Sequence, residues 1–137
     1  MTVILYTDGA SQGNPGLAGA GVAITDEQGR LLAEERKFLG QQTNNAAEYE
    51  ALILGLETAK RLGARVVHWR TDSELLQRQW IGVYKIKKPE LMVLAQKARK
   101  LADQFEKVTA AHIYREENSI ADGLATKAIK EHLRQLR

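Results

Sequence analysis

The chain opens on the run Val3-Ile4-Leu5-Tyr6-Thr7-Asp8, and a second run of the same plan, Val66-Val67-His68-Trp69-Arg70-Thr71-Asp72, follows near its middle. Each run is short, apolar and rich in β-branched and aromatic residues, which predicts a buried strand. An aspartate at the end of a core strand is costly to desolvate unless something compensates its charge. At the ends of neighbouring parallel strands, Asp8 and Asp72 would repel each other, so the pair would hold a proton or a cation. The pattern therefore points to a metal-dependent active site.

Composition is that of an ordinary globular domain. The 137 residues are 44% apolar and 27% charged, which suits one domain spanning residues 1–137. Lys and Arg number 20 and Asp and Glu 17, and this net charge of +3 permits a nucleic-acid partner but fits an ordinary basic surface equally well. The chain has no cysteine, which excludes disulfides and thiolate chemistry and favours a cytoplasmic location. Neither a membrane span nor a signal peptide is expected.

The spacing of apolar residues and turn formers predicts alternating strands and helices. Three strands joined by short turns should form an antiparallel meander, and the strand after the first helix should lie parallel to one of them. The expected elements are, in chain order, strands at 2–7, 18–25 and 31–39, a helix from 43 to about 62, a strand at 65–71, a short helix at 73–80, a helix from Pro89 with an apolar stripe ending at Phe105, a strand at 107–114 and a helix at 119–136. Glycines in the second strand mark places where another backbone packs closely. The order indicates an α/β fold with a mixed sheet, in which ligands bind beyond the carboxyl ends of parallel strands.

Two further acids occupy unusual positions on helices. Glu48 precedes Leu52 and Leu56 by four and eight residues, so it shares the buried stripe of the first helix. Asp122 lies at the edge of the inward face of the last helix. Taken singly, such acids have structural explanations, because the first turn of a helix favours acids and aspartates cap turns and helices.

The joint pattern is more specific than any single acid. Four carboxylates stand at the edge of the expected core: Asp8, Glu48, Asp72 and Asp122. Facing one point without cations, they would repel one another. Oxygen ligands favour Mg²⁺ or Mn²⁺ over zinc, and two such ions about 4 Å apart form a site for in-line phosphoryl transfer.

Four motifs in this order resemble those of the type-1 ribonuclease H family. The first is Tyr-Thr-Asp-Gly-Ala-Ser (6–11) followed by Gly-Asn-Pro-Gly (13–16), and the second is Thr-Asn-Asn-Ala-Ala-Glu (43–48). The third is Thr-Asp-Ser (71–73), and the fourth is Arg-Glu-Glu-Asn-Ser-Ile-Ala-Asp (115–122). A single Thr-Asp is worthless as a motif, but four motifs with the family's order and spacing are specific.

The resemblance implies a fold, a reaction and a ligand set. The fold would be ribonuclease H-like, a five-stranded mixed sheet flanked by helices, and the reaction would be endonucleolytic hydrolysis of the RNA strand of an RNA/DNA hybrid. Products would carry 5′-phosphate and 3′-hydroxyl ends. The implied catalytic residues and ligands of two Mg²⁺ ions, for which Mn²⁺ can substitute, are Asp8, Glu48, Asp72 and Asp122, with Asp8 as the bridging ligand.

The resemblance also implies substrate-binding residues. Gly13, Asn14, Asn44 and Asn45 match positions that contact the minor groove of the hybrid. Amide side chains and closely approaching backbone suit hydrogen bonds to a 2′-hydroxyl, which distinguishes RNA from DNA. Thr43 matches a phosphate contact. The alternative is that residues 14–16 form only a turn and that the polar residues at 43–45 only cap a helix.

The chain departs from the family pattern in three places. Glu74 replaces an amide that reads bases in some members, and its carboxylate would weaken hybrid binding or point away. The large basic protrusion of many bacterial members is reduced to residues 80–88, where Trp80 is interpreted as a core aromatic or as part of a vestigial basic patch. The segment before Asp122 is short, so His112 is expected to be a structural strand residue, and Arg115 is the expected electrostatic helper near the scissile phosphate.

Alternative functions remain open at the level of sequence. The reduced protrusion also fits a broader nuclease that cuts double-stranded RNA. A non-catalytic nucleic-acid-binding module of the same fold is a further alternative, although a pure binder has no use for four carboxylates facing phosphates. A monomer without an obligate protein partner is expected.

Overall fold

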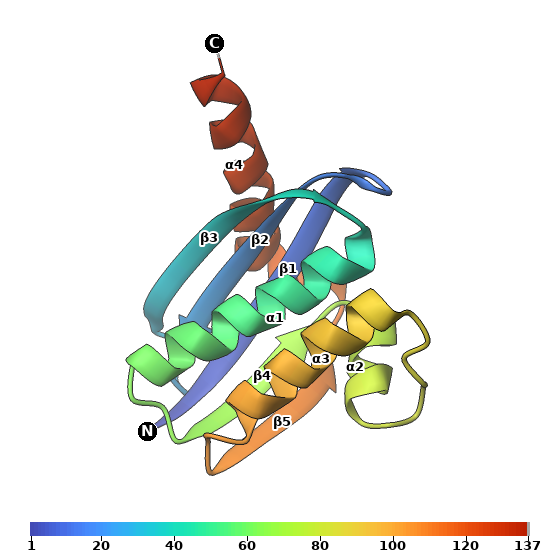
Figure 1. Cartoon of the computed structure of the whole chain (residues 1–137). Coiled ribbons are helices and arrows are strands. Elements are labelled where there is room, and N and C mark those ends of the chain that lie inside the picture. Colours follow the sequence, from blue (N-terminus) through green and yellow to red (C-terminus); the bar gives the residue numbers. More distant parts are fainter. Residues whose placement is uncertain (137) are drawn as a thin grey trace.

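The computed structural model describes residues 1–136 and contains one five-stranded sheet (Figure 1). Its strands lie in the order β3-β2-β1-β4-β5. Their bounds are β1 (Thr2–Gly13), β2 (Gly16–Thr25), β3 (Leu31–Gln42), β4 (Val66–Thr71) and β5 (Lys107–His112). The first three strands pair antiparallel, whereas β4 lies parallel to β1 and β5 lies parallel to β4. The expected mixed sheet with an antiparallel meander is confirmed.

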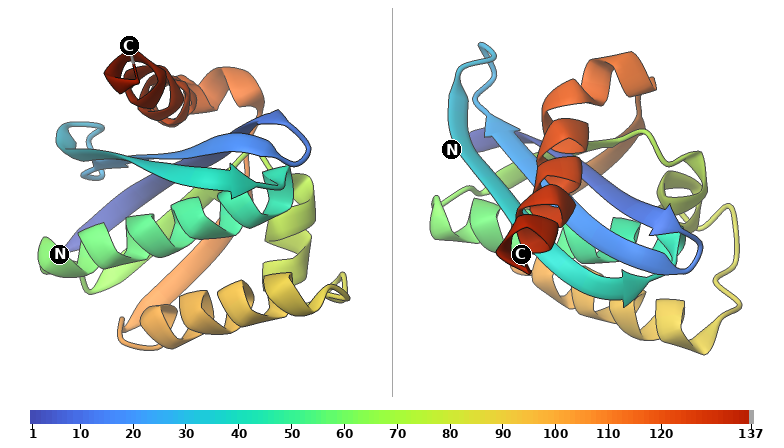
Figure 2. Two further views of the ribbon diagram at one scale, coloured as in Figure 1. Left: turned by 45° about the horizontal axis from the view of Figure 1, so that its top comes forward. Right: turned by 90° about the horizontal axis from the view of Figure 1, so that it is seen from above.

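Helices cover both faces of the sheet. They are α1 (Asn44–Arg61), α2 (Glu74–Trp80), α3 (Pro89–Ala102) and α4 (Ser119–Gln135), with a short 3₁₀ helix, η1 (Arg115–Asn118), before α4. The views in Figure 2 place α1 and α3 on one face and α4 on the other. Within residues 1–136, no helix has the length and apolar character that a membrane crossing requires. The predicted α/β class with flanking helices is therefore confirmed.

The first strand is longer than the sequence pattern indicated. The turn formers at 8–16 predicted a connection between the first two strands, but residues 8–13 continue the antiparallel ladder with β2 as far as the pair Gly13 and Gly16. Cross-strand pairing here overrides the turn propensity of the individual residues. The parallel ladder of β1 with β4 ends earlier, at the pair Thr7 and Thr71. Beyond this pair, β4 no longer covers that edge of β1, and Asp8 is the first residue past the last pair.

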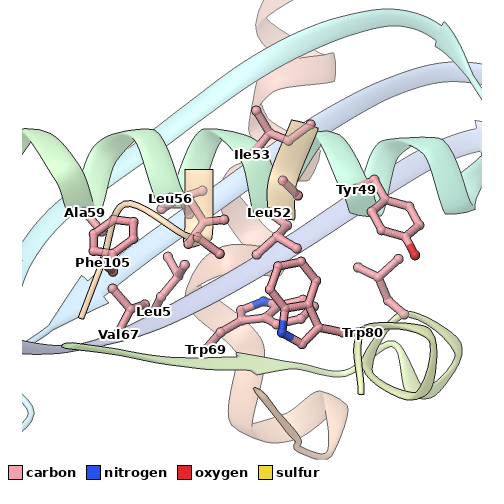
Figure 3. Packing of buried hydrophobic residues seen from close by; sticks show 14 of the residues in the cluster. Leu5, Tyr49, Leu52, Ile53, Leu56, Ala59, Val67, Trp69, Trp80 and Phe105 are labelled. Atoms are coloured by element: carbon pink, nitrogen blue, oxygen red, sulfur yellow. The ribbon is translucent and has the colours of Figure 1, made fainter. Parts of the chain in front are cut away.

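The main core lies between the sheet and helices α1 and α3 (Figure 3). Trp69 and Trp80 meet edge to face with ring centroids 5.5 Å apart, and both are buried. The guanidinium of Arg99 lies 3.6 Å from the centroid of the Trp80 ring, and it also donates to the Trp80 carbonyl oxygen. Trp80 is thus a core residue that joins α2 to α3, as one of the two interpretations predicted.

The opposite face depends on close backbone contact between β2 and α4. A Cβ atom added to Gly21 would lie 2.0 Å from the carbonyl oxygen of Ala121, and one added to Gly19 would lie 2.3 Å from that of Ala125. Both glycines let the α4 backbone rest directly on the strand. The expectation of close backbone packing in this strand is confirmed, and the contact fixes the depth at which α4 carries Asp122.

Candidate active site

The predicted acids come together at one end of the sheet. One carboxylate oxygen from each of Asp8, Glu48 and Asp72 lies within 4.8 Å of the others. Asp122, in the first turn of α4, lines an open cavity of about 420 Å³ together with Asp8 and Asp72. The four side chains come from four different elements or their ends, so only the folded chain assembles the cluster.

Gly9 brings the helix that carries Glu48 against the strand that carries Asp8. Its backbone N–H donates to Glu48 Oε1 over 2.7 Å. A Cβ atom at this position would lie 2.3 Å from the carbonyl carbon of Ala47 and 2.4 Å from the nitrogen of Glu48. The sequence around Gly9 gives no signal for this contact, because an Asp-Gly pair is typical of a turn.

Burial and mutual repulsion perturb the acids strongly. Asp8 is 6% exposed and Glu48 is 9% exposed. Burial, the charge of Glu48 and a hydrogen bond between the carboxyls of Asp8 and Asp122 raise the pKa of Asp8 to about 9. Burial and the charges of Asp72 and Asp122 raise the pKa of Glu48 to about 8, although the N–H of Gly9 favours its ionised form. At neutral pH the metal-free cluster therefore retains protons.

This donor set fits a hard divalent cation. It consists of carboxylate oxygens alone, and it is buried enough that a cation would replace the retained protons. Oxygen ligands without nitrogen or sulfur favour Mg²⁺ or Mn²⁺. The carboxylates of Asp8, Glu48 and Asp72 could hold such an ion, and Asp122 lies in position to complete the set.

The predicted substrate-binding residues also lie together. Asn14 Oδ1 accepts a hydrogen bond from the backbone N–H of Asn44 over 3.1 Å, which ties the β1–β2 turn to the start of α1. Gly13 enters this turn with φ of 102°, a conformation that favours glycine. Thr43 Oγ1 accepts from the N–H of Ala46 over 3.2 Å and so caps α1. The structure thus gives Thr43 its capping role, and its phosphate contact stays a prediction.

Two basic side chains border the acid cavity. Arg115, the first residue of η1, lines the cavity, and its role as electrostatic helper stays a prediction. His112 is the last residue of β5, in keeping with the expected strand residue, and its exposed side chain also lines the cavity. β5 ends where His112 pairs with Thr71, the residue directly before Asp72, and this register places His112 at the edge of the acid cavity. The predicted strand ran to residue 114, two residues beyond the observed end of β5, and so placed His112 in the strand interior instead of at its end.

The remaining departures have local explanations. Glu74 Oε1 accepts from Nε of Arg78 over 2.8 Å within α2, so a basic partner offsets its charge. Residues 81–88 form a loop between α2 and α3, in which Lys85, Lys87 and Lys88 are exposed. The basic protrusion is thus reduced to this loop, as the sequence indicated.

Comparison with known proteins supports these observations. Residues 6–128 match the family model described as "Reverse transcriptase-like". The chain is 41% identical over 130 residues to the bifunctional protein Rv2228c of Mycobacterium tuberculosis, covering 94% of this chain but 36% of that protein. It is 38% identical over 126 residues to ribonuclease HI of Halobacterium salinarum, covering 92% of this chain and 63% of that protein. The chain therefore spans about a third of the mycobacterial relative and under two thirds of the archaeal one.

A solved structure agrees over nearly the full length of both chains. LC11-RNase H1, solved in complex with an RNA/DNA hybrid, superposes with a TM-score of 0.92 and 44% identity, covering 96% of this chain and 99% of that one. The four sequence motifs supply the four acids that meet at one end of the sheet. The chain accordingly belongs to the type-1 ribonuclease H family, in the compact form without a large basic protrusion.

Proposed function

We propose that the protein is a metal-dependent endonuclease that hydrolyses the RNA strand of RNA/DNA hybrids. The observation that carries the proposal is the buried carboxylate cluster, with oxygens of Asp8, Glu48 and Asp72 within 4.8 Å of one another. LC11-RNase H1, at 44% identity, was solved with an RNA/DNA hybrid, which supports the choice of substrate. Two bound Mg²⁺ ions, or Mn²⁺ in their place, would supply an activated water and stabilise the leaving 3′-oxygen, giving 5′-phosphate and 3′-hydroxyl ends.

Three of the acids, Asp8, Glu48 and Asp72, are each held by a different part of the fold. Asp8 would hold metal together with Glu48 and Asp72, whose carboxylate oxygens lie within 4.8 Å of its own, and the family resemblance implies the bridging role for it. Glu48 is held in one orientation by the N–H of Gly9. Asp72 follows β4 immediately and begins the turn into α2, whose N-cap is Ser73. A cluster held by strand and helix ends keeps its geometry without rearrangement during the reaction.

Selectivity for RNA is assigned to the β1–β2 turn and the start of α1. Asn44 is exposed beside Asn14, and Asn45 is partly exposed. Their amides and the backbone at Gly13 can donate to and accept from the 2′-hydroxyls that only the RNA strand carries. Thr43 is proposed to contact a phosphate with its hydroxyl proton while its oxygen caps the helix.

Arg115 is proposed as the electrostatic helper. It lines the acid cavity, and a guanidinium there would stabilise the charge that develops on the scissile phosphate. His112 occupies the same cavity wall and is a second candidate for this role. Arg115→Lys and His112→Gln, assayed side by side, would distinguish the two.

Cleavage of double-stranded RNA is the second candidate activity. The short loop at 81–88 leaves little protein to grip a DNA strand, and this observation favours a less selective enzyme. A non-catalytic binding module is the third candidate. The monomeric state and the cytoplasmic location stay predictions.

The test uses end-labelled RNA/DNA, RNA/RNA and DNA/DNA duplexes with Mg²⁺, Mn²⁺ or chelator. Asp72→Asn is the inactive variant, and Asp103→Asn, which makes the same change at an exposed carboxylate after α3, is the matched control. Internal cuts in the hybrid's RNA alone, lost only in Asp72→Asn, would support the proposal, and additional cuts in RNA/RNA would support the broader enzyme. Hybrid binding without cleavage under any metal would overturn both and favour the binding module.

A further inference from the structure

Asn118 is a buried amide outside the carboxylate cluster, and the proposed mechanism does not use it. It is 1% exposed and lies at the junction between η1 and α4. Its Nδ2 donates to the main-chain oxygen of Thr7 over 2.9 Å, although the two residues are 111 positions apart. Thr7 is the residue directly before Asp8, and Asn118 is four residues before Asp122.

The amide of Asn118 is only half satisfied. Within residues 1–136, its Oδ1 is buried and has no hydrogen-bond partner. A buried acceptor without a partner destabilises the fold, whereas an apolar side chain of similar size would avoid this cost. As an N-cap residue, Asn118 makes no side-chain capping bond either. The hydrogen bond that Nδ2 donates to Thr7 is therefore the one interaction in the described part of the chain that explains why an amide, and not an apolar side chain, stands at this position.

The bond to Thr7 joins two elements that carry metal-binding candidates. Gly21 sets how closely the first turn of α4 approaches the sheet, because Ala121 rests on its backbone. This contact sets the depth of the helix on the sheet but is not a directional bond to β1, the strand that carries Asp8. Asn118 adds a directional contact to β1, and Glu117, which accepts from the N–H of Tyr114, holds the segment leading to it. Together these contacts fix the place of Asp122 beside Asp8.

Thr7 is also tied on its other side. Its Oγ1 accepts from Nε1 of Trp69 in β4 over 2.9 Å, and both residues are buried. The residue before Asp8 thus contacts both β4, which leads to Asp72, and the start of α4, which carries Asp122. Because Thr7 is bonded to Asn118 and directly precedes Asp8, a displacement of α4 would also move Asp8.

We propose that Asn118 is a positioning residue that sets the metal affinity of the site by holding Asp122 in register with Asp8. This inference rests on the proposed function only in taking the four acids to be metal ligands. It goes beyond that function because Asn118 touches neither metal nor substrate. Losing the donor would loosen the pairing of Asp8 with Asp122 and weaken metal binding, while the substrate face at Asn14 and Asn44 would be unchanged.

The experiment compares two variants that both lose the amide donor and its unpaired oxygen but differ in the space they fill. Asn118→Leu keeps the branched shape of the side chain, whereas Asn118→Ala leaves a cavity. The matched control is Thr58→Val, which removes the hydrogen bond from a buried Thr58 hydroxyl to the carbonyl oxygen of Leu54, far along α1 from the acids. Mn²⁺ binding to the substrate-free protein is measured by calorimetry, and thermal unfolding is measured in chelator.

We expect both Asn118 variants to bind Mn²⁺ at least about fivefold more weakly than wild type, and Thr58→Val to bind it within about twofold of wild type. Outer-shell partners of metal ligands typically change metal affinity by about 10–100-fold. The Mg²⁺ concentration for half-maximal cleavage should rise by the same factor, while the KM for hybrid stays unchanged. Mn²⁺ affinity that is unchanged, or that follows the unfolding temperature across all three variants, would overturn it. Wild-type protein that binds Mn²⁺ but cleaves no hybrid would overturn the proposed function, and the calorimetric comparison would still decide the role of Asn118.

Discussion

Asp8 shows how a single residue combines a structural cost with a functional use. Its carboxyl is almost fully buried, and Glu48, Asp72 and Asp122 all disfavour its ionised form. A protein selected for stability alone would place an amide or an apolar residue here. The raised pKa of Asp8 is therefore typical of a functional site, and a bound cation would offset the repulsion among these carboxylates.

The metal-free protein should lose stability as pH rises. The carboxyl of Asp8 has an ordinary pKa of 3.8 and a folded-state pKa of about 9, so between these values the folded state holds a proton that the unfolded chain releases. The free energy of unfolding must then fall with increasing pH across this interval. Asp8→Asn removes this titration, so the variant should show a shallower decline and exceed wild type in stability near about pH 8.

Thermal unfolding in chelator from about pH 5 to about pH 8 measures this effect, since the slope reports the difference in bound protons. Asp103→Asn, at an exposed position, is the control and should follow wild type. A variant at Asp8 with the wild-type slope would show that the carboxyl is ionised in the folded protein.

Gly9 should tolerate no side chain. In Gly9→Ala the new Cβ would meet the backbone of Ala47 at 2.3 Å, so α1 must move away from β1 and the bond to Glu48 must lengthen. We expect a loss of about 1–3 kcal/mol in the free energy of unfolding, as for other overpacked sites, together with weaker Mn²⁺ binding. Chemical denaturation and calorimetry test this, and a variant with wild-type values of both would show that the close contact is not needed.

The close packing of α4 on β2 depends on glycines in β2, because any side chain there would meet the helix backbone. Gly21→Ala would place a Cβ 2.0 Å from the carbonyl oxygen of Ala121, whereas a Cβ at Gly123 in the same helix meets nothing within 4 Å. Gly21→Ala should therefore destabilise the protein by about 1–3 kcal/mol, and Gly123→Ala should stabilise it by about 0.5–1 kcal/mol through helix propensity. Denaturant unfolding of the pair checks the prediction, and equal effects would contradict the packing described for α4.

Thr43 caps the N-terminus of α1. Thr43→Ala removes the acceptor for the N–H of Ala46 and should cost about 1 kcal/mol, whereas Thr43→Ser keeps an acceptor and should cost less. Both variants can be compared by urea denaturation and by hybrid binding. If Thr43→Ser restores stability but not hybrid affinity, the methyl group contributes to the substrate face; if Thr43→Ala leaves stability unchanged, the cap is unimportant.

At the scale of the whole molecule, much of the architecture could be predicted from local patterns. The order of elements, the parallel placement of β4 and the helix starts at Thr43 and Ser73 follow from apolar periodicity and capping residues. The four acids could be placed on one edge because strand ends and first helical turns meet there in such folds.

Other features depend on tertiary contacts that no local pattern contains. The extension of β1 to Gly13 required the partner strand β2, and the exposed position of His112 followed from where β5 stops. The contact of Gly9 with Ala47 and the bond from Asn118 to Thr7 join residues far apart in the sequence. These contacts set the distances between the acids, which is why the residues of the site were predictable and their supports were not.

The four acids are proposed to form a metal-dependent site for cutting the RNA strand of a hybrid. The most direct measurement is cleavage of an RNA/DNA duplex labelled on the RNA, with Mg²⁺ and with chelator, by wild type, Asp8→Asn and the control Asp103→Asn. We expect internal cuts by wild type and the control only with Mg²⁺, and none by Asp8→Asn although it folds. Equal cleavage by Asp8→Asn, or cleavage in chelator, would show that these acids do not form a metal-dependent catalytic site.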